Sequence, residues 1–212
     1  VSKKSISSIE LSKALGITQK SAWYLLHKIR CAMKNAKCKQ LQGVVEVDET
    51  YCGPRKPRYR GGKRGRGTSK QGIFGALQRE GDVFITAVPD TKRRTLEPII
   101  KERVKKGSTI FSDEYGVYRR LHTDYDHHTV NQGIKEYARG NVHVNSLEGA
   151  WRHFKSVLMG TYHRPSKQHL DKYCAEFAQN YNTRNDSVEV RFQKSLRLIN
   201  SRVMYKDIVP RV

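Results

Sequence analysis

Residues 43–51 form the stretch GVVEVDETY, which is rich in valine. Its valines, Val44, Val45 and Val47, are β-branched residues that favour a strand. Asp48 lies inside this apolar run, where an ionised carboxylate is costly unless it is paired, hydrogen-bonded or bound to a metal. The stretch therefore predicts a buried strand that carries a functional acid.

The segments that follow predict an α/β domain. Residues 72–78 and 82–90 read as two further strands, which a turn at Glu80 and Gly81 joins into a meander with the first. Beyond them the pattern predicts a helix over 96–106, a strand over 108–113, a short helix around 118–121 and a strand near 128–130, with helix from there to 184. Strands with interspersed helices predict a mixed sheet flanked by helices.

The N-terminal segment ELSKALGITQKSAWYLLHKIR, residues 10–30, predicts two helices separated by a turn at Gly16. In a helix-turn-helix the second helix enters the major groove of DNA with its N-terminal side chains forward. Those side chains are Gln19, Lys20 and Ser21, with Tyr24, Lys28 or Arg30 nearer phosphate. The alternative is an ordinary helical hairpin with a solvated basic face.

The charge of the 212-residue chain is concentrated in particular segments. The formal net charge is +21. Residues 1–42 hold nine Lys or Arg and one acid, and residues 54–70 hold eight Lys or Arg and no acid, whereas the rest of residues 43–185 is nearly balanced. Basic segments attached to a nearly neutral core are expected when those segments contact a polyanion such as DNA.

Other classes of protein receive no support from the sequence. No apolar run approaches the ~18 residues that a membrane span needs, so we expect a soluble cytoplasmic protein without a membrane partner. The four cysteines form no CxxC pair and predict neither a zinc site nor a disulfide framework. The first residue is Val, which suggests a fragment or processed product.

Three acids are the candidates for chemistry. Besides Asp48, Asp113 ends the predicted strand IFSD, and Glu148 lies in the helical segment HVNSLEGAWRHFKSVLMG at 143–160. In that segment Leu147, Trp151, Phe154 and Leu158 form an apolar stripe, and Asn145, Glu148, Arg152 and Lys155 form a polar stripe beside it. Each acid taken alone also fits a surface carboxylate. Because Glu46, Glu49 and Glu114 are close neighbours, the pattern does not separate them from Asp48 and Asp113.

Converging carboxylates repel one another unless divalent cations neutralise them. Mg²⁺ prefers oxygen ligands together with water and phosphate oxygens, and two such ions about 4 Å apart support phosphoryl transfer. The three acids therefore favour a site with two Mg²⁺ ions, for which Mn²⁺ would substitute.

Five ordered blocks resemble the ISXO-like DDE transposases of bacterial insertion sequences. They are VEVDETY at 45–51, FSDEYGVY at 111–118, HVNSLEG at 143–149, GTYH at 160–163 and EFAQNYNTR at 176–184. Asp113 and Glu148 are 35 positions apart, similar to the spacing in many DDE enzymes. The resemblance spans roughly residues 5–185.

The resemblance implies a ribonuclease H-like fold in which Asp48 bridges both metal ions and Asp113 and Glu148 each bind one. Asn145 matches an additional polar position of the group and has a supporting role, and His143 shares its block. The implied reaction is hydrolysis at the terminal inverted repeats of a mobile element, followed by attack of the freed 3′-hydroxyl on target DNA. A homo-oligomer assembled on double-stranded DNA, associated with the bacterial nucleoid, is the expected working form. Relatives often carry an N-terminal zinc ribbon, which this chain begins too late to contain.

The sequence thus predicts a helix-turn-helix module over 1–40, a catalytic domain over 41–185 with a basic loop at 54–70, and a tail over 186–212 for oligomer contacts. The expected phosphate contacts of the loop and the catalytic helix are Arg55, Lys56, Arg58, Arg60, Lys63, Arg64, Arg66, Arg152 and Lys155. Two other functions remain open. One is a DNA-binding regulator without catalysis, which the presence of all three acids argues against, and the other is a structure-selective nuclease or resolvase on the same fold.

Overall fold

The computed structural model describes residues 5–35, 39–53, 70–134, 138–163, 165–198 and 203–209. The chain forms two compact units, one made of Val1–Lys37 with Ser156–Val212 and the other of Cys38–Lys155. The sequence predicts boundaries after residues 40 and 185 instead. No helix in the described ranges has the length and apolar character needed to cross a membrane.

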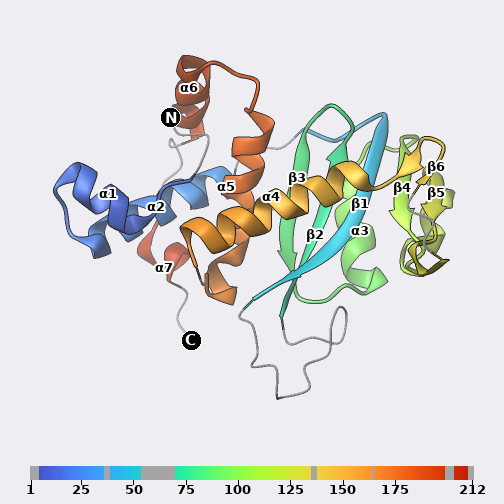
Figure 1. The fold of residues 1–212 in the computed structure, drawn as a ribbon, viewed down its shortest axis with the longest axis horizontal. Helices are drawn as coiled ribbons and strands as arrows, with labels where there is room; N and C mark the ends of the chain where they lie inside the picture. The colour runs from blue at the N-terminus through green and yellow to red at the C-terminus, as the bar shows by residue number, and fades with distance from the viewer. Residues whose placement is uncertain are drawn as a thin grey trace. The chain divides into compact units, whose positions relative to one another are not determined.

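The unit Cys38–Lys155 is built on a five-stranded sheet with the strand order β3-β2-β1-β4-β5. The strands are β1 (Val44–Cys52), β2 (Gln71–Gln78), β3 (Val83–Val88), β4 (Thr109–Asp113) and β5 (Asp126–Val130). The first three pair antiparallel as the predicted meander, and β1, β4 and β5 run parallel (Figure 1). This arrangement confirms the predicted mixed sheet flanked by helices.

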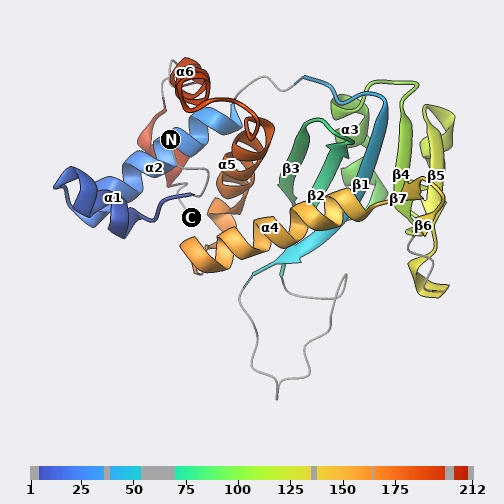
Figure 2. The ribbon, with the colours of Figure 1, turned by 45° about the horizontal axis from the view of Figure 1, so that its top comes forward.

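The two faces of β1 meet different partners because successive side chains of a strand point to opposite faces. Val45 and Val47 lie in the main core with Leu96 and Ile100 of α3 (Arg93–Arg103). On the other face lies α4 (Asn145–Thr161), with Leu147 and Trp151 against Gly75 of β2. Figure 2 shows α3 and α4 on opposite faces of the sheet. Glu46 and Asp48 therefore share a face with α4.

The other unit consists mainly of helices. They are α1 (Ser8–Leu15), α2 (Gln19–Lys34), α5 (Leu170–Asn182), α6 (Val188–Leu198) and α7 (Tyr205–Ile208). Ser7 and Glu10 form a capping box at the start of α1, and Gly16 ends this helix in the left-handed conformation at φ 64°. Thr18 then caps α2 by accepting a hydrogen bond from the Ser21 amide. Both helices lie where the sequence predicts them.

Three elements differ from the prediction. Helix α3 begins at Arg93, three residues before the predicted start. The sequence gives no signal for this start, because Lys92 at the N-cap makes no side-chain capping bond. Residues 131–184 are not helical throughout, since the short strands β6 (Ala138–Arg139) and β7 (Val142–His143) pair antiparallel before α4. The sequence pattern of the tail over 186–212 does not decide between a strand and a short helix, and this segment contains the eleven-residue helix α6.

Candidate active site

Asp48 is the half-buried acid at the centre of the candidate site. It pairs across the sheet with Gly75 of β2, and the indole ring of Trp151 lies over this glycine. A Cβ atom at position 75 would come within 2.5 Å of that ring. Trp151 Nε1 donates a hydrogen bond to Asp48 Oδ2 at 3.0 Å. The close approach at Gly75 thus allows α4 to contact the carboxylate directly.

Asp113 ends β4 beside Asp48. The β1–β4 ladder pairs Val44 with Thr109 and Glu46 with Phe111, and continuing this register by two residues places Asp48 beside Asp113 on the same face. The Tyr115 amide donates to Asp113 Oδ1 at 3.0 Å. The structure therefore brings together two of the three predicted acids.

The surroundings of Asp48 disfavour its charged form. Burial, the largest cause, and the negative charges of Glu49 and Asp113 together raise the pKa of Asp48 to about 7, while the hydrogen bond from Trp151 opposes the shift. A carboxylate held against neighbouring negative charge is stabilised by a cation. This is the electrostatic setting expected of a metal ligand.

Glu148 lies in the first turn of α4, half-buried and one helical turn before Trp151. The backbone amide of its neighbour Leu147 donates to Glu46 Oε2 at 2.9 Å, and Ser146 Oγ donates to Glu46 Oε1 at 3.0 Å. Helix α4 is therefore joined to β1 on both sides of Glu148, through Glu46 before it and through Asp48 after it.

Glu46 is fully buried and has a cationic partner. Arg79 Nε donates to Glu46 Oε1 at 2.9 Å, and Arg79 Nη2 donates to the backbone oxygen of His143 at 3.0 Å. The Arg79 guanidinium also lies over the ring of Phe111, 4.7 Å from its centroid. A buried carboxylate paired with arginine and with the positive end of a helix is well compensated. The cluster of Glu46, Arg79 and His143 fixes the start of α4.

The three neighbouring acids have other partners. Glu46 binds α4 and Arg79 as described, and Glu49 points to the opposite face of β1, where Tyr118 Oη donates to it at 2.7 Å. Burial and the charge of Glu49 raise the pKa of Tyr118 well above its usual value, so this phenol keeps its proton. Glu114 is exposed and accepts a hydrogen bond from the Gly133 amide at 3.2 Å. The geometry favours Asp48 and Asp113 over these neighbours as a pair.

The donor set formed by Asp48 and Asp113 fits a hard divalent cation, because Mg²⁺ is commonly held by one or two carboxylates and completes its shell with water and phosphate. Within the described part of the chain, no group of three acids, histidines or cysteines lies close enough to hold a metal ion. Glu148 is thus held on the adjoining helix but does not form a ready three-ligand cage. Asn145 begins the helix and is exposed.

The residues predicted to contact DNA have different locations. Gln19, Lys20, Ser21 and Lys28 are exposed on α2, and Arg152 and Lys155 are exposed on α4. The loop cations Arg55, Lys56, Arg58, Arg60, Lys63, Arg64 and Arg66 lie outside the described residues. The expectation for Arg30 was wrong: this side chain is buried and forms an ion pair with Glu176 at 2.9 Å, so it does not face phosphate.

Sequence reasoning missed four residues of the site. Trp151 was assigned only to the apolar stripe, where it is indeed buried, and its role as a donor to Asp48 was not foreseen. Gly75 and Arg79 were not linked to the acids, and Glu46 was considered only as an alternative to Asp48, without its role as the anchor of α4. The valines around Glu46 were one available signal, because a carboxylate in such a run needs a partner as much as Asp48 does.

The chain is similar to an uncharacterized transposase-like protein of Haemophilus influenzae, 26% identical over 115 residues that cover 54% of this chain and 92% of that protein. Among solved structures it resembles a chain of the cryo-EM structure of the simian T-cell lymphotropic virus intasome in complex with PP2A regulatory subunit B56 gamma. That match has a TM-score of 0.44 and 14% identity, and covers 94% of this chain and 72% of the other. Residues 40–182 match the model of the ISXO2-like transposase domain, and the chain belongs to this transposase family.

Proposed function

We propose that this protein catalyses metal-dependent DNA strand cleavage and 3′-hydroxyl strand transfer in the transposition of a bacterial insertion sequence. The observation that carries the proposal is the adjacent pair Asp48 and Asp113, with α4 and its Glu148 fastened to the same strand. Membership of the transposase family supports it.

In this proposal Asp48 and Asp113 hold Mg²⁺ or Mn²⁺, and Glu148 contributes the third carboxylate. When bound, two such ions supply activation of the attacking oxygen and stabilisation of the leaving oxygen. Trp151 orients Asp48 by occupying Oδ2, and Glu46 with Arg79 keeps the first turn of α4 in place. Asn145, exposed at the start of the helix, supports a ligand or a phosphate. No covalent bond between protein and DNA is required.

DNA binding is the second part of the proposal. Gln19, Lys20 and Ser21 are exposed in the first turn of α2, where the side chains of a recognition helix contact base edges, and Lys28 is exposed farther along. Arg152 and Lys155 are exposed on α4, one and two turns after Glu148, and supply positive charge to the DNA backbone. The partners are the inverted repeats of the element and target DNA, which a homo-oligomer would hold together.

The test is a cleavage and joining assay with DNA that carries the ends of the element. We expect nicking and then joining with Mg²⁺ or Mn²⁺, and loss of both steps in Asp48→Asn, Asp113→Asn and Glu148→Gln. Glu102→Gln is a matched control, because this carboxylate is 66% exposed in an ion pair with Arg103 away from the three acids. Retained activity in any of the three variants would reject that residue's assignment. Nicking without joining would indicate a nuclease, and DNA binding without cleavage would indicate a regulator.

A further inference from the structure

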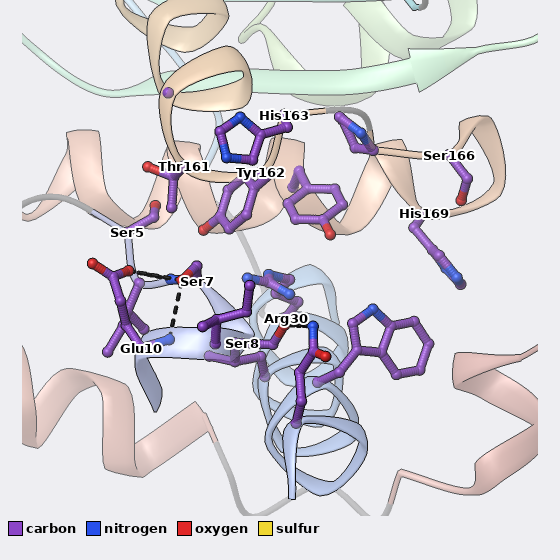
Figure 3. A pocket seen from close by; sticks show the side chains of 18 residues that line it. Ser5, Ser7, Ser8, Glu10, Arg30, Thr161, Tyr162, His163, Ser166 and His169 are labelled. Carbon is purple, nitrogen blue, oxygen red and sulfur yellow. Dashed lines mark hydrogen bonds between the residues drawn. The ribbon is translucent and has the colours of Figure 1, made fainter. Parts of the chain in front are cut away.

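A large pocket lies within the helical unit, between the start of α1, one side of α2 and the segment that joins α4 to α5. Its volume is about 1040 Å³. All four residues of the GTYH block at 160–163 line it, and the proposed chemistry gives this block no role. In Figure 3, Thr161, Tyr162 and His163 lie along one side of the pocket, and Ser7, Ser8 and Glu10 lie along the other.

A buried arginine lines this pocket with an incomplete set of hydrogen bonds. Arg30 is 2% exposed, and its Nε donates to Glu176 Oε2 at 2.9 Å. Its Nη2 is buried and has no hydrogen-bond partner among the residues that the structure describes. A buried donor without a partner carries a free-energy penalty, which a ligand oxygen would relieve.

The walls of the pocket are aromatic. Arg30 lies over the rings of Tyr162 and Tyr173, 4.9 Å and 4.5 Å from their centroids, and Trp23 and His169 contact each other edge to face at 5.4 Å. His163 has a positive φ of 57°, a conformation that non-glycine residues rarely adopt and that often marks functional sites. The lining of the pocket is therefore rich in flat rings.

The charges that line or adjoin the pocket are largely compensated. Glu176 is paired with Arg30 and also accepts a hydrogen bond from Tyr162 Oη at 2.7 Å, while Glu10 accepts hydrogen bonds from Ser7 in the capping box. A strongly anionic or cationic ligand is thus disfavoured. A flat, uncharged ring with a carbonyl acceptor matches the aromatic walls and the free Arg30 donor.

We infer that this pocket receives an unpaired nucleobase of the DNA that the protein binds. Nucleobases combine a stacking surface with carbonyl acceptors, and stacking on aromatic side chains is the usual way in which proteins hold bases outside a duplex. Gln19 belongs both to the rim of the pocket and to the exposed first turn of α2, so a base displaced beside that helix is within reach. The inference rests on the proposed function, which supplies the DNA.

Trp23 provides a direct measurement, because the chain has only two tryptophans. In a Trp151→Phe protein the fluorescence comes from Trp23 alone, and a base stacked in the pocket quenches it. We expect a short single-stranded oligothymidylate to quench this signal. The same strand annealed to its complement, and an abasic strand with the same phosphates, should bind the basic surfaces without quenching. If Trp151→Phe does not fold, NMR of the fluorotryptophan-labelled natural chain gives the same readout, with the Trp23 signal assigned from Trp23→Phe.

The variants separate stacking from general effects. Tyr162→Ala should weaken the binding that quenches Trp23 by roughly 5- to 150-fold, the range for loss of one stacked base. Tyr162→Phe keeps the ring and should bind nearly as well as the parent. Tyr181→Ala removes an aromatic ring of α5 that is not part of the pocket lining and should have no effect. Equal quenching by the abasic strand, or unchanged binding in Tyr162→Ala, would overturn the inference. Neither result depends on cleavage, so failure of the pocket and failure of the proposed chemistry are distinguishable.

Discussion

Trp151 and Asp48 are joined by a hydrogen bond of 3.0 Å from the indole Nε1 to the carboxylate Oδ2. The bond links the helix that carries Glu148 to the strand that carries Asp48. It exists because position 75 has no side chain, so the indole ring lies against the backbone of β2 next to Asp48. The geometry of the acids thus depends on a tryptophan and a glycine that take no part in the chemistry.

We expect Gly75→Ala to damage both stability and activity. The new Cβ would lie 2.5 Å from the Trp151 ring and 3.2 Å from Leu147 Cδ1, so the helix must shift. Overpacking of this kind costs about 1–3 kcal/mol, which chemical denaturation measures, and cleavage should fall with it. Gly149→Ala is the control, because a Cβ there meets no atom within 4 Å and alanine favours helix. Equal loss of stability in both variants would contradict the packing argument.

Asp48→Asn should stabilise the protein in the absence of metal while abolishing cleavage. The folded-state pKa of about 7 lies above the ordinary value of 3.8, so the folded protein holds the proton more tightly than the unfolded chain does. Stability therefore falls as pH rises from about 4 to 7, and above pH 7 the charged form costs about 2–4 kcal/mol. Thermal unfolding at pH 8 should therefore show that Asp48→Asn is more stable than the natural chain. At pH 4 the two proteins should be equally stable.

Metal provides the complementary measurement for the same variant. Mg²⁺ should raise the unfolding temperature of the natural chain at pH 8 and have little effect on Asp48→Asn, because a ligand stabilises the state that binds it. An equal response of the two proteins to Mg²⁺ would remove Asp48 from the metal site.

The five strands of the main sheet were predictable because they follow from local pattern, whereas the choice of Asp48 and Asp113 over their acidic neighbours depended on the resemblance to the transposase family. The valine run around Asp48 and the apolar run before Asp113 specify two strands, and parallel pairing then brings the acids to the same edge. Trp151 shows the limit of this reasoning. Its spacing identifies a buried position, but the donor role of its Nε1 depends on where α4 crosses the sheet, which no local pattern contains.

Arg30 shows the same limit in the helical unit. A basic residue on a predicted recognition helix suggests contact with phosphate, yet its partner Glu176 is 146 positions away in the chain. Only the packing of α2 against α5 brings the two together. The residues of β6 and β7 were missed for another reason, since strands of two residues are too short for alternation to be visible.

Glu46→Gln should loosen the start of α4 without touching Asp48. The substitution removes the charge that pairs with Arg79 and with the amide of Leu147, and breaking a buried ion pair costs about 3–5 kcal/mol. Hydrogen exchange at the Leu147 amide should accelerate, and cleavage should decrease. Glu97→Gln breaks the more exposed pair with Lys101 and should cost less than about 1 kcal/mol. Unchanged exchange at Leu147 would show that Glu46 does not hold the helix.

Deleting residues 55–66 should weaken DNA binding broadly and reduce its salt dependence. The segment carries seven Lys or Arg and no acid, and each phosphate contact contributes about 0.9 to the slope of log affinity against log salt. Titrations of unrelated duplexes at several salt concentrations measure the slope. The Arg152→Ala variant of the full chain provides a comparison in which one cation is lost. A slope that the deletion leaves unchanged would mean that these cations do not contact phosphate.

His27 should make the helical unit sensitive to acid. Its ring is fully buried against Trp23, His169 and Tyr173, and both ring nitrogens lack hydrogen-bond partners among the described residues. Burial lowers the pKa of His27 to about 3, and the nearby charges of Arg30, His169 and Lys172 contribute in the same direction.

In the unfolded chain His27 binds a proton near pH 6.5, whereas in the folded chain it binds one only near pH 3. The free energy of unfolding is therefore highest above pH 6.5 and falls as the pH is lowered. At pH 5 the loss is about 2 kcal/mol. His27→Phe should remove most of this dependence, leaving the part due to His169, whose pKa burial also lowers. His122→Phe changes an exposed ring and is the control. Chemical denaturation at pH 5 and pH 8 measures this pH dependence. If His27→Phe and the natural chain show the same dependence, His27 is not the source of the acid sensitivity.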